Sequence, residues 1–244
     1  MTEHTTEALG RLKRLVPNSV KDAVKEAYWG VRRERLWRRA MRRAHELPPG
    51  ERPSRELIAE LQAGWGNESY AARTDYLEEV AARALETRGH VLECGSGLSS
   101  VLLGLTAGRR GFRTWSLEHH PEWRERVAGA LDRAHIEGVN VCHAPLKSYG
   151  DFDWYDPPAE GMPEEFALVV CDGPPGMTKG GRYGLLPVMR ERLRADAVVL
   201  LDDAEREGEA DVLGRWASES QLTCEMRETP TGAYAVVTLG GEAR

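Results

Sequence analysis

Three short segments of this 244-residue chain combine glycines or carboxylates in patterns that could carry chemistry. The first is Glu93-Cys94-Gly95-Ser96-Gly97, whose two glycines permit a tight turn and a close approach of the backbone to a ligand. The others are Val170-Cys171-Asp172 and Leu201-Asp202-Asp203, in which an apolar run ends in acid. Carboxylates that converge on one pocket repel one another unless a cation lies among them, and a carboxylate can also accept a proton from a reacting group.

Each of these segments ends an apolar run, and the runs alternate with helical patterns. The runs are His90–Cys94, Thr114–Glu118, Val139–Ala144, Ala167–Cys171 and Ala197–Leu201, with helices expected near 98–107, 121–136 and 182–194. Such alternation predicts a parallel sheet. Two last runs, Leu222–Met226 and Tyr234–Leu239, flank a short link with Pro and Gly, which predicts an antiparallel hairpin. The expected fold class is α/β: a Rossmann-like sheet of seven mostly parallel strands, an antiparallel C-terminal hairpin and an N-terminal helical extension.

The N-terminal segment differs from the rest of the chain in charge. From Arg11 to Ala44 there are twelve Lys and Arg against three acids, a net +9; the whole chain carries −6, so the remainder carries −15. Apolar stripes at helical spacing change phase after Gly30, which predicts two amphipathic helices, 19–29 and 31–46, ended by Pro48-Pro49-Gly50. Two more helices are expected at 53–64 and 69–87. We expect a basic helical extension over 1–50 and a second domain over 51–244.

The ends of the predicted strands suit a nucleotide-like ligand, because ligands of open parallel sheets bind beyond the carboxyl ends of the strands. Glu118 ends the second strand, where its carboxylate could accept two hydrogen bonds from ribose hydroxyls. The third strand leads into Ala144-Pro145-Leu146, where an apolar wall and a backbone amide could hold an adenine. A nicotinamide dehydrogenase is the main competitor, but it favours Gly-x-Gly-x-x-Gly or Ala, and Ser100 stands at the last position.

These motifs resemble those of the class I S-adenosylmethionine-dependent methyltransferases. Glu93–Gly97 resembles the family's first motif, Leu117-Glu118 its second and Val170–Asp172 its fourth, and the resemblance spans about residues 65–240. It implies that 51–244 is the methyltransferase domain, and that Trp65 and Tyr70 could close over the cofactor. The residues expected to bind S-adenosylmethionine are Glu93, Gly95, Ser96, Gly97, Glu118, His119, Ala144, Pro145, Leu146 and Asp172.

The acids at the fourth and fifth strand ends resemble the metal-dependent O-methyltransferases. By that resemblance, Asp172, Asp202 and Asp203 hold Mg²⁺ or another divalent cation, which would chelate the acceptor and lower the pKa of its hydroxyl. Gly181-Arg182 and Asp203-x-x-Arg206-x-x-Glu209 add a narrower resemblance to the glucuronoxylan O-methyltransferase branch, whose acceptor is a sugar. At the two positions where members of this family carry a catalytic base, this sequence has Pro174 and Pro175. The catalytic base is therefore either Asp203 or a metal-bound hydroxide. Asp172 and Asp203 are the expected catalytic residues.

The expected function is methyl transfer from S-adenosylmethionine to a hydroxyl of a small molecule or saccharide. Two alternatives are an RNA methyltransferase guided by the Arg-rich N-terminus and a non-catalytic cofactor-binding module. The −15 charge after the N-terminal segment argues against nucleic acid as partner. Residues 11–46 could meet an anionic membrane surface, form a homodimer or cap the active site.

The cysteines and the start of the chain bear on the compartment. Cys94, Cys142, Cys171 and Cys224 form no CxxC and lie in or beside apolar runs, which predicts buried free thiols. The start shows no basic segment followed by an apolar core. A cytoplasmic protein is expected, with contact to the inner face of the membrane as an option.

Overall fold

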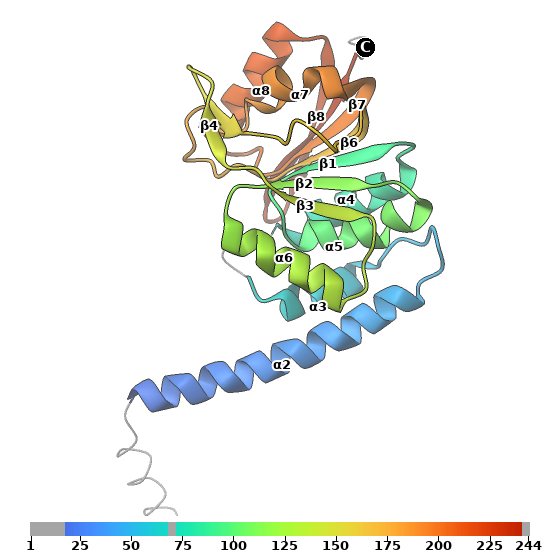
Figure 1. The fold of residues 1–244 in the computed structure, drawn as a ribbon, viewed down its shortest axis with the longest axis vertical. Helices are drawn as coiled ribbons and strands as arrows, with labels where there is room; N and C mark the ends of the chain where they lie inside the picture. Colours follow the sequence, from blue (N-terminus) through green and yellow to red (C-terminus); the bar gives the residue numbers. More distant parts are fainter. Residues whose placement is uncertain (1–17, 68–71, 241–244) are drawn as a thin grey trace, which may run out of the picture.

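A seven-stranded mixed sheet forms the centre of the protein, seen in a computed structural model that describes residues 18–67 and 72–240 (Figure 1). The strand order is β3-β2-β1-β6-β7-β9-β8. Strands β1, β2, β3, β6 and β7 run parallel, and β9 pairs antiparallel with its two neighbours, β7 and β8. The strands are β1 (His90–Cys94), β2 (Thr114–Glu118), β3 (Val139–His143), β6 (Phe166–Cys171), β7 (Leu193–Leu201), β8 (Leu222–Thr229) and β9 (Gly232–Leu239). The predicted fold class is confirmed, including the hairpin.

Helices cover both faces of the sheet because the strand residues are apolar on both sides. One face, which includes Val91, Leu168 and Val170, packs against α4 (Thr74–Glu86) and α5 (Leu98–Leu105). The other, which includes Leu92, Val169 and Leu201, packs against α7 (Leu185–Met189) and α8 (Glu207–Glu219). Figure 1 shows α6 (Pro121–Arg133) beside α5, and α3 (Arg55–Trp65) beneath them. The sheet is thus buried between layers, as a parallel sheet requires.

The N-terminal segment forms one helix rather than two. Helix α2 (Asn18–Glu46) continues through Gly30, which corrects the two helices expected on either side of that residue. A glycine inside a helix costs about 1 kcal/mol relative to alanine, and the arginines that follow it are good helix formers. The apolar residues before and after Gly30 do lie on different sides, but these are two faces of one continuous helix. Ala40, Met41 and Ala44 pack into a cluster with α3, α5 and α6, so the C-terminal part of α2 shares an apolar core with the helical layer.

Three other segments differ from the sequence-based prediction. The helix expected over 182–194 is reduced to α7 and a 3₁₀ turn, and β7 begins at Leu193. The backbone at Gly181 has a φ of 55°, which is incompatible with an α-helix, so the chain turns there before α7 begins. A small hairpin of β4 (Leu146–Ser148) and β5 (Asp153–Tyr155) was not predicted. Helix 69–87 begins at Thr74 in the structure, and Tyr70 lies outside the described residues.

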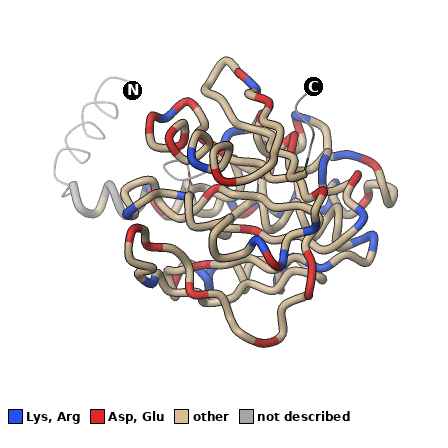
Figure 2. Tube along the Cα trace, turned by 90° about the horizontal axis from the view of Figure 1, so that it is seen from above, with Lys and Arg blue, Asp and Glu red and all other residues tan. Residues whose placement is uncertain are grey.

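Only two of the four cysteines, all of which were expected to be buried, are buried in the structure. All four cysteines are free and Cys94 and Cys171 are buried, but Cys142 is partly exposed and Cys224 is exposed, because it lies on the edge strand β8. Figure 2 shows acidic and basic residues interspersed over the body of the protein. Among the described helices, none has the length and apolar content needed to cross a membrane.

A pair of deletions should separate the two parts of α2. We expect removal of residues 1–34 to leave the free energy of unfolding nearly unchanged, since described side chains from Lys25 to Arg35 are exposed. Removal of residues 1–47 should lower it by about 3 kcal/mol, because Met41 and two alanines then no longer cover α3. Urea unfolding followed by circular dichroism measures both. Equal stability of the two deletions would contradict the packing role of the C-terminal part.

Candidate active site

The loop after β1 is held in a tight turn against the loop after β6. Gly95 has a φ of 87°, and a side chain there would lie 3.2 Å from the backbone nitrogen of Gly173. The backbone N–H groups of Asp172 and Gly173 both donate to the carbonyl of Cys94, at 3.1 and 2.7 Å. A residue other than glycine at 95 would therefore be strained and crowded at once. The close approach of the two loops places Asp172 directly beside the glycine loop.

Glu93 supports this loop from below. Its side chain is fully buried, and its Oε2 accepts a 2.6 Å hydrogen bond from the hydroxyl of Ser100. The same hydroxyl accepts from the backbone N–H of Gly97 at 3.0 Å, so Ser100 links Glu93 to the loop. Burial raises the pKa of Glu93 to about 7. Its Oε1 has no hydrogen-bond partner among the described residues, although it is buried.

Glu118 lies at the end of β2 as predicted, but its carboxylate is already engaged. Oε2 accepts from the backbone N–H and hydroxyl of Ser96, at 3.1 and 2.8 Å, and Oε1 accepts from the backbone N–H of His120 at 2.9 Å. His119 Nδ1 lies 3.2 Å from Oε1. Burial alone would raise the pKa of Glu118, but these hydrogen bonds outweigh it and hold the pKa below its usual value. Oε2 accepts two of these hydrogen bonds and Oε1 accepts one, so a ribose hydroxyl could still donate to Oε1.

In the segment expected to hold an adenine, two backbone groups are already engaged and the side chain of Leu146 is accessible. The N–H of Ala144 donates to the carbonyl of Glu118, and the carbonyl of Pro145 accepts from Asp156, so both groups are used within the protein. Leu146 remains partly exposed at the start of β4. Trp65, expected over the cofactor, packs in the helical layer between Trp37 and Trp123, at centroid distances of 5.4 and 6.3 Å.

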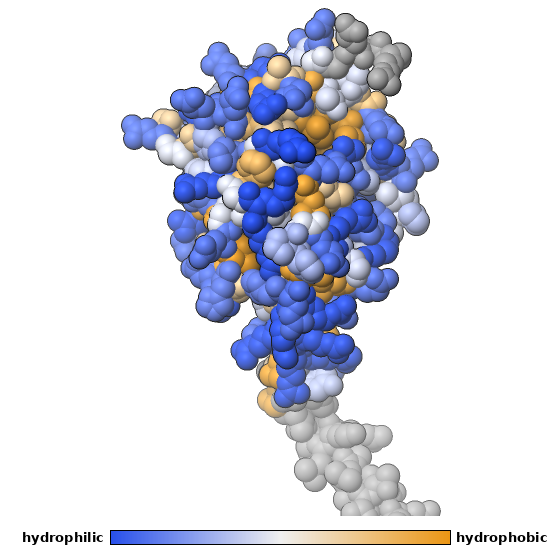
Figure 3. Space-filling model, turned by 90° about the vertical axis from the view of Figure 1, so that its right-hand side faces the viewer, coloured by the Kyte–Doolittle hydropathy of each residue, from blue (hydrophilic) through white to orange (hydrophobic). Residues whose placement is uncertain are grey.

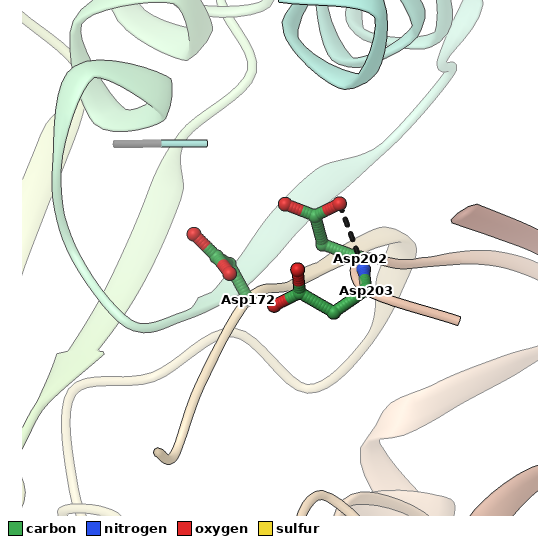
Figure 4. Close-up of side chains that lie close together, drawn as sticks. All are labelled: Asp172, Asp202 and Asp203. Atoms are coloured by element: carbon green, nitrogen blue, oxygen red, sulfur yellow. Dashed lines mark hydrogen bonds between the residues drawn. The ribbon is translucent and has the colours of Figure 1, made fainter. Parts of the chain in front are cut away.

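The three predicted acids meet at the carboxyl ends of β6 and β7. Carboxylate oxygens of Asp172, Asp202 and Asp203 all lie within 4.8 Å of one another. Figure 4 shows the three side chains turned toward a common space, with Asp172 on one loop and the adjacent pair on the next; the dashed line joins the Asp203 N–H to Asp202 Oδ1, at 2.8 Å. Asp203 has a φ of 57°, an unusual value for a residue with a side chain.

A buried arginine lies among these acids. The Nη2 of Arg182 donates to Asp172 Oδ1 at 3.2 Å, to Asp203 Oδ2 at 3.1 Å and to the carbonyl of Asp172 at 2.7 Å, and Nη1 donates to the carbonyl of Asp202. Its Nε lies 3.7 Å from Glu209 Oε1. The side chain of Arg182 is 2% exposed, so it supplies a cation inside the cluster. Gly181-Arg182 contributed to the resemblance to the glucuronoxylan O-methyltransferase branch, but the spacing of residues in the sequence does not predict that the Arg182 side chain is buried among the acids.

Two further arginines neutralise Asp203 from outside. Arg73 Nη2 lies 3.3 Å from Asp203 Oδ1, and Arg206 Nη1 lies 2.8 Å from Oδ2. Arg73 also pairs with Glu205. Both oxygens of Asp203 are therefore occupied. In the described part of the chain, Asp172 Oδ2 and Asp202 Oδ2 accept no hydrogen bond, so these two atoms remain for a substrate, a water or a cation.

The environment favours the protonated forms of the other two acids. Burial raises the pKa of Asp172 to about 8, although Arg182 opposes the shift. Burial also raises the pKa of Asp202 to about 6, and the neighbouring Asp203 carboxylate adds to the effect. Groups with such pKa values gain and lose protons near neutral pH, which is what a proton acceptor in a reaction requires.

Solved structures share this fold, whereas no family model and no curated protein matches the sequence. A putative caffeoyl-CoA O-methyltransferase from Staphylococcus aureus is 11% identical, with a TM-score of 0.56 over 75% of this chain and 92% of that one. A methyltransferase from Podospora anserina, bound to SAH, is 14% identical, with a TM-score of 0.53 over 91% and 97%. An O-methyltransferase from Bacillus cereus, in complex with SAH, is 15% identical, with a TM-score of 0.51 over 85% and 99%. The chain has the fold of class I S-adenosylmethionine-dependent methyltransferases.

Replacement of Arg182 by methionine should expose the electrostatic role of this residue. We expect Arg182→Met to lower the free energy of unfolding by about 3–5 kcal/mol near pH 8, because it leaves buried carboxylates without their cation. A folded-state pKa above the unfolded one stabilises the fold at low pH, and this stability is lost as pH rises through the folded pKa. Arg182 lowers the folded-state pKa of both Asp202 and Asp172, so the deficit of the variant should be smallest below about pH 6 and should grow as the pH rises through the wild-type values of about 6 and about 8.

Urea unfolding at several pH values measures this effect. Arg194→Met is the matched control, since Arg194 forms an exposed pair with Asp196 and its loss should cost less than about 0.5 kcal/mol at every pH. A deficit of Arg182→Met that is the same at pH 5 and pH 8 would show that packing, and not charge, explains its effect.

Proposed function

We propose that this chain transfers a methyl group from S-adenosylmethionine to a hydroxyl of a small molecule or saccharide. The observation that carries the proposal is the position of Asp172, whose backbone N–H donates to the Cys94 carbonyl at the glycine loop and whose carboxylate lies within 4.8 Å of that of Asp202. Ligands of this fold class bind across the carboxyl ends of the strands. An acceptor hydroxyl between the loop and the two acids would meet both a methyl donor and a proton acceptor.

The glycine loop fits a bound nucleotide-like cofactor. A side chain added at Gly97 would meet no protein atom within 4 Å, so the space in front of the loop is open. Two buried polar atoms near the loop, Glu93 Oε1 and the hydroxyl of Tyr155, have no hydrogen-bond partner among the described residues. Gly95, Ser96, Gly97, Glu118 and His119 would hold the cofactor, with Leu146 against the adenine. S-adenosylmethionine supplies the methyl group and keeps the bonding electron pair as the thioether of S-adenosylhomocysteine.

Asp172 is the group best placed to accept the proton of the hydroxyl. As the acceptor oxygen attacks the methyl carbon, its O–H bond breaks and the proton passes to Asp172 Oδ2, the atom free of Arg182. Alignment of the hydroxyl with the methyl group is the larger requirement, because methyl transfer from a sulfonium needs little help at the leaving group. Asp202 Oδ2, the other free oxygen, would orient the hydroxyl. Asp203, held by three arginines, would position this pair and not touch the substrate.

A divalent cation is the second candidate for activating the hydroxyl. The convergence of three carboxylates within 4.8 Å favours it, and Asp172 Oδ2 and Asp202 Oδ2 would be its ligands. The cation would lower the pKa of the acceptor hydroxyl. The Arg182 guanidinium already supplies positive charge at this place, so the proton-acceptor route is preferred. The expected ligand role of Asp203 would require it to leave its arginines.

Methylation of RNA receives less support from the arrangement of charges. The Arg-rich helix α2 packs on α3, whereas the free carboxylate oxygens lie at the ends of β6 and β7. A phosphate backbone would have to approach Asp172 and Asp202, which is unfavourable. A non-catalytic module would not need two acids whose pKa values are raised toward neutrality.

Substitution of Gly97 tests the cofactor site. We expect Gly97→Val to weaken binding of S-adenosylhomocysteine at least about 100-fold, because the new side chain would fill the space in front of the loop while touching no protein atom. Isothermal titration calorimetry measures the affinity. Gly214→Val on α8, another glycine with open space at its Cβ, is the matched control and should bind normally. Undiminished binding by Gly97→Val would remove the cofactor site from this loop.

Acid substitutions and a chelator test the proton-acceptor route. With a hydroxylated acceptor and labelled cofactor, we expect Asp172→Asn to lower kcat by about 100-fold or more, while cofactor affinity is retained. The wild-type kcat/KM should rise with pH between about 6 and 8, because the acceptor carboxylate must be ionised and burial has raised its pKa.

The chelator separates the two candidate routes. Activity should persist in EDTA if Asp172 accepts the proton directly. Loss of activity in EDTA, restored by Mg²⁺ or Mn²⁺, would replace the proton-acceptor route by the metal route. Absence of transfer to every hydroxylated acceptor tested, from a protein that binds the cofactor, would contradict the proposed function itself.

A further inference from the structure

Helix α2 carries two opposite surfaces, and only one of them is used by the fold. Trp37, Ala40, Met41 and Ala44 face the body, where the last three are buried. Val20, Tyr28 and Val31 are 48%, 61% and 54% exposed. At 100° per residue these three lie within roughly 80° of one another and on the side opposite to the packed residues. The apolar stripe formed by Val20, Tyr28 and Val31 therefore points away from the body.

Toward the C-terminal end of α2, the side of the helix that faces away from the body carries basic residues. Arg35, Arg38 and Arg42 follow Val31 at helical spacing and are exposed. They lie within the same sector of roughly 80° as the apolar stripe. One face of α2 thus presents apolar side chains first and arginines next; we call it the outer face, formed by Val20, Tyr28, Val31, Arg35, Arg38 and Arg42. Described residues of α2 include nine Lys and Arg against four acids.

The fold extends the basic surface beyond the helix itself. A groove of about 590 Å³ lies between α2 and α6, and Arg38 and Arg42 line it together with Arg126 and Arg133 of α6. Arg126 is stacked over Trp123, at 4.7 Å from the ring centroid. Figure 1 shows α2 as a straight rod that crosses beneath the body and projects past it, and Figure 3 shows its projecting part as a mainly hydrophilic column with an apolar spot near the tip.

We infer that α2 binds the surface of an anionic lipid bilayer and holds the methyltransferase body against it. The outer face of α2 would lie in the plane of the interface, with Val20, Tyr28 and Val31 among the acyl chains. Arg35, Arg38 and Arg42 would contact lipid phosphates, and the groove would receive further headgroups. This inference goes beyond the proposed function and does not depend on it.

Three observations favour a membrane over other partners. The outer face combines aliphatic side chains with arginines, whereas a nucleic-acid surface has no use for exposed Val20 and Val31. A second copy of α2 would bring two helices of the same positive charge together, and the exposed apolar stripe is only a few residues long. The helix packs on α3, and none of the described ion-pair partners of Asp172 and Asp203 lies on α2, which argues against a cap over the active site.

Vesicle flotation with the full chain tests the inference. We expect the protein to float with vesicles of equimolar phosphatidylcholine and phosphatidylglycerol but not with vesicles of phosphatidylcholine alone, and to be released by high salt. Arg35→Gln/Arg38→Gln/Arg42→Gln should reduce partitioning by about 100-fold or more. Tyr28→Ser/Val31→Ser should reduce it as well, with the charge unchanged, because the apolar contribution is lost.

A control variant separates local from overall charge. Arg88, Arg113 and Arg227 are exposed on the body, so Arg88→Gln/Arg113→Gln/Arg227→Gln makes the same charge change elsewhere and should float as the wild type does. Circular dichroism checks that every variant is folded. Equal loss in the control, or no flotation by the wild type, would overturn the inference. A dimer in light scattering that dissociates on Tyr28→Ser/Val31→Ser, without flotation, would assign the outer face to a second copy. Binding of mixed-sequence RNA without flotation would assign it to nucleic acid.

Discussion

The buried guanidinium of Arg182 is the interaction on which the rest of the site depends. Asp172, Asp202 and Asp203 lie on two neighbouring strand ends, and their mutual repulsion in a buried pocket would otherwise force these ends apart or leave the acids protonated. Arg182 donates to two of the carboxylates and to two strand-end carbonyls, so one side chain ties the ends of β6 and β7 together. A planar guanidinium with several donors can do this, and a lysine ammonium could not match the geometry.

The arginines also divide the acids by role. Asp203 faces Arg182, Arg73 and Arg206, and its charge is compensated on both oxygens. Asp172 and Asp202 each keep an oxygen free, and burial raises their pKa values although Arg182 opposes the shift. Three chemically identical groups within one cluster therefore become one carboxylate that is paired on both oxygens and two carboxyl groups whose pKa values lie near neutrality. This difference arises from neighbours that lie far away in the sequence, such as Arg73.

The sequence predicted the sheet and the convergence of the acids because both follow from local patterns. Apolar runs such as His90–Cys94 and Ala167–Cys171 match β1 and β6 closely, and the carboxyl ends of parallel strands must meet at one edge. The position of Arg182 could not be predicted, since a buried arginine is indistinguishable in sequence from the many exposed ones. The hydrogen bonds that Ser96 and His120 donate to Glu118 could not be predicted either, because hydrogen-bond partners depend on distances in the folded structure. The helix expected over 182–194 was wrong because Gly181 has a left-handed conformation, Arg182 is held in the cluster and β7 already begins at Leu193.

The N-terminal helix shows how a correct pattern can support a wrong prediction of structure. The apolar stripe does change phase at Gly30, and two helices that each bury one stripe would explain it. A single helix satisfies the same pattern if one stripe packs against α3 and the other faces outward, but then the second stripe has no partner among the described residues. Exposed valine and tyrosine beside arginine on one helical face are unfavourable in water alone. The phase change is therefore better explained by an external surface that is apolar and anionic than by a break in the helix.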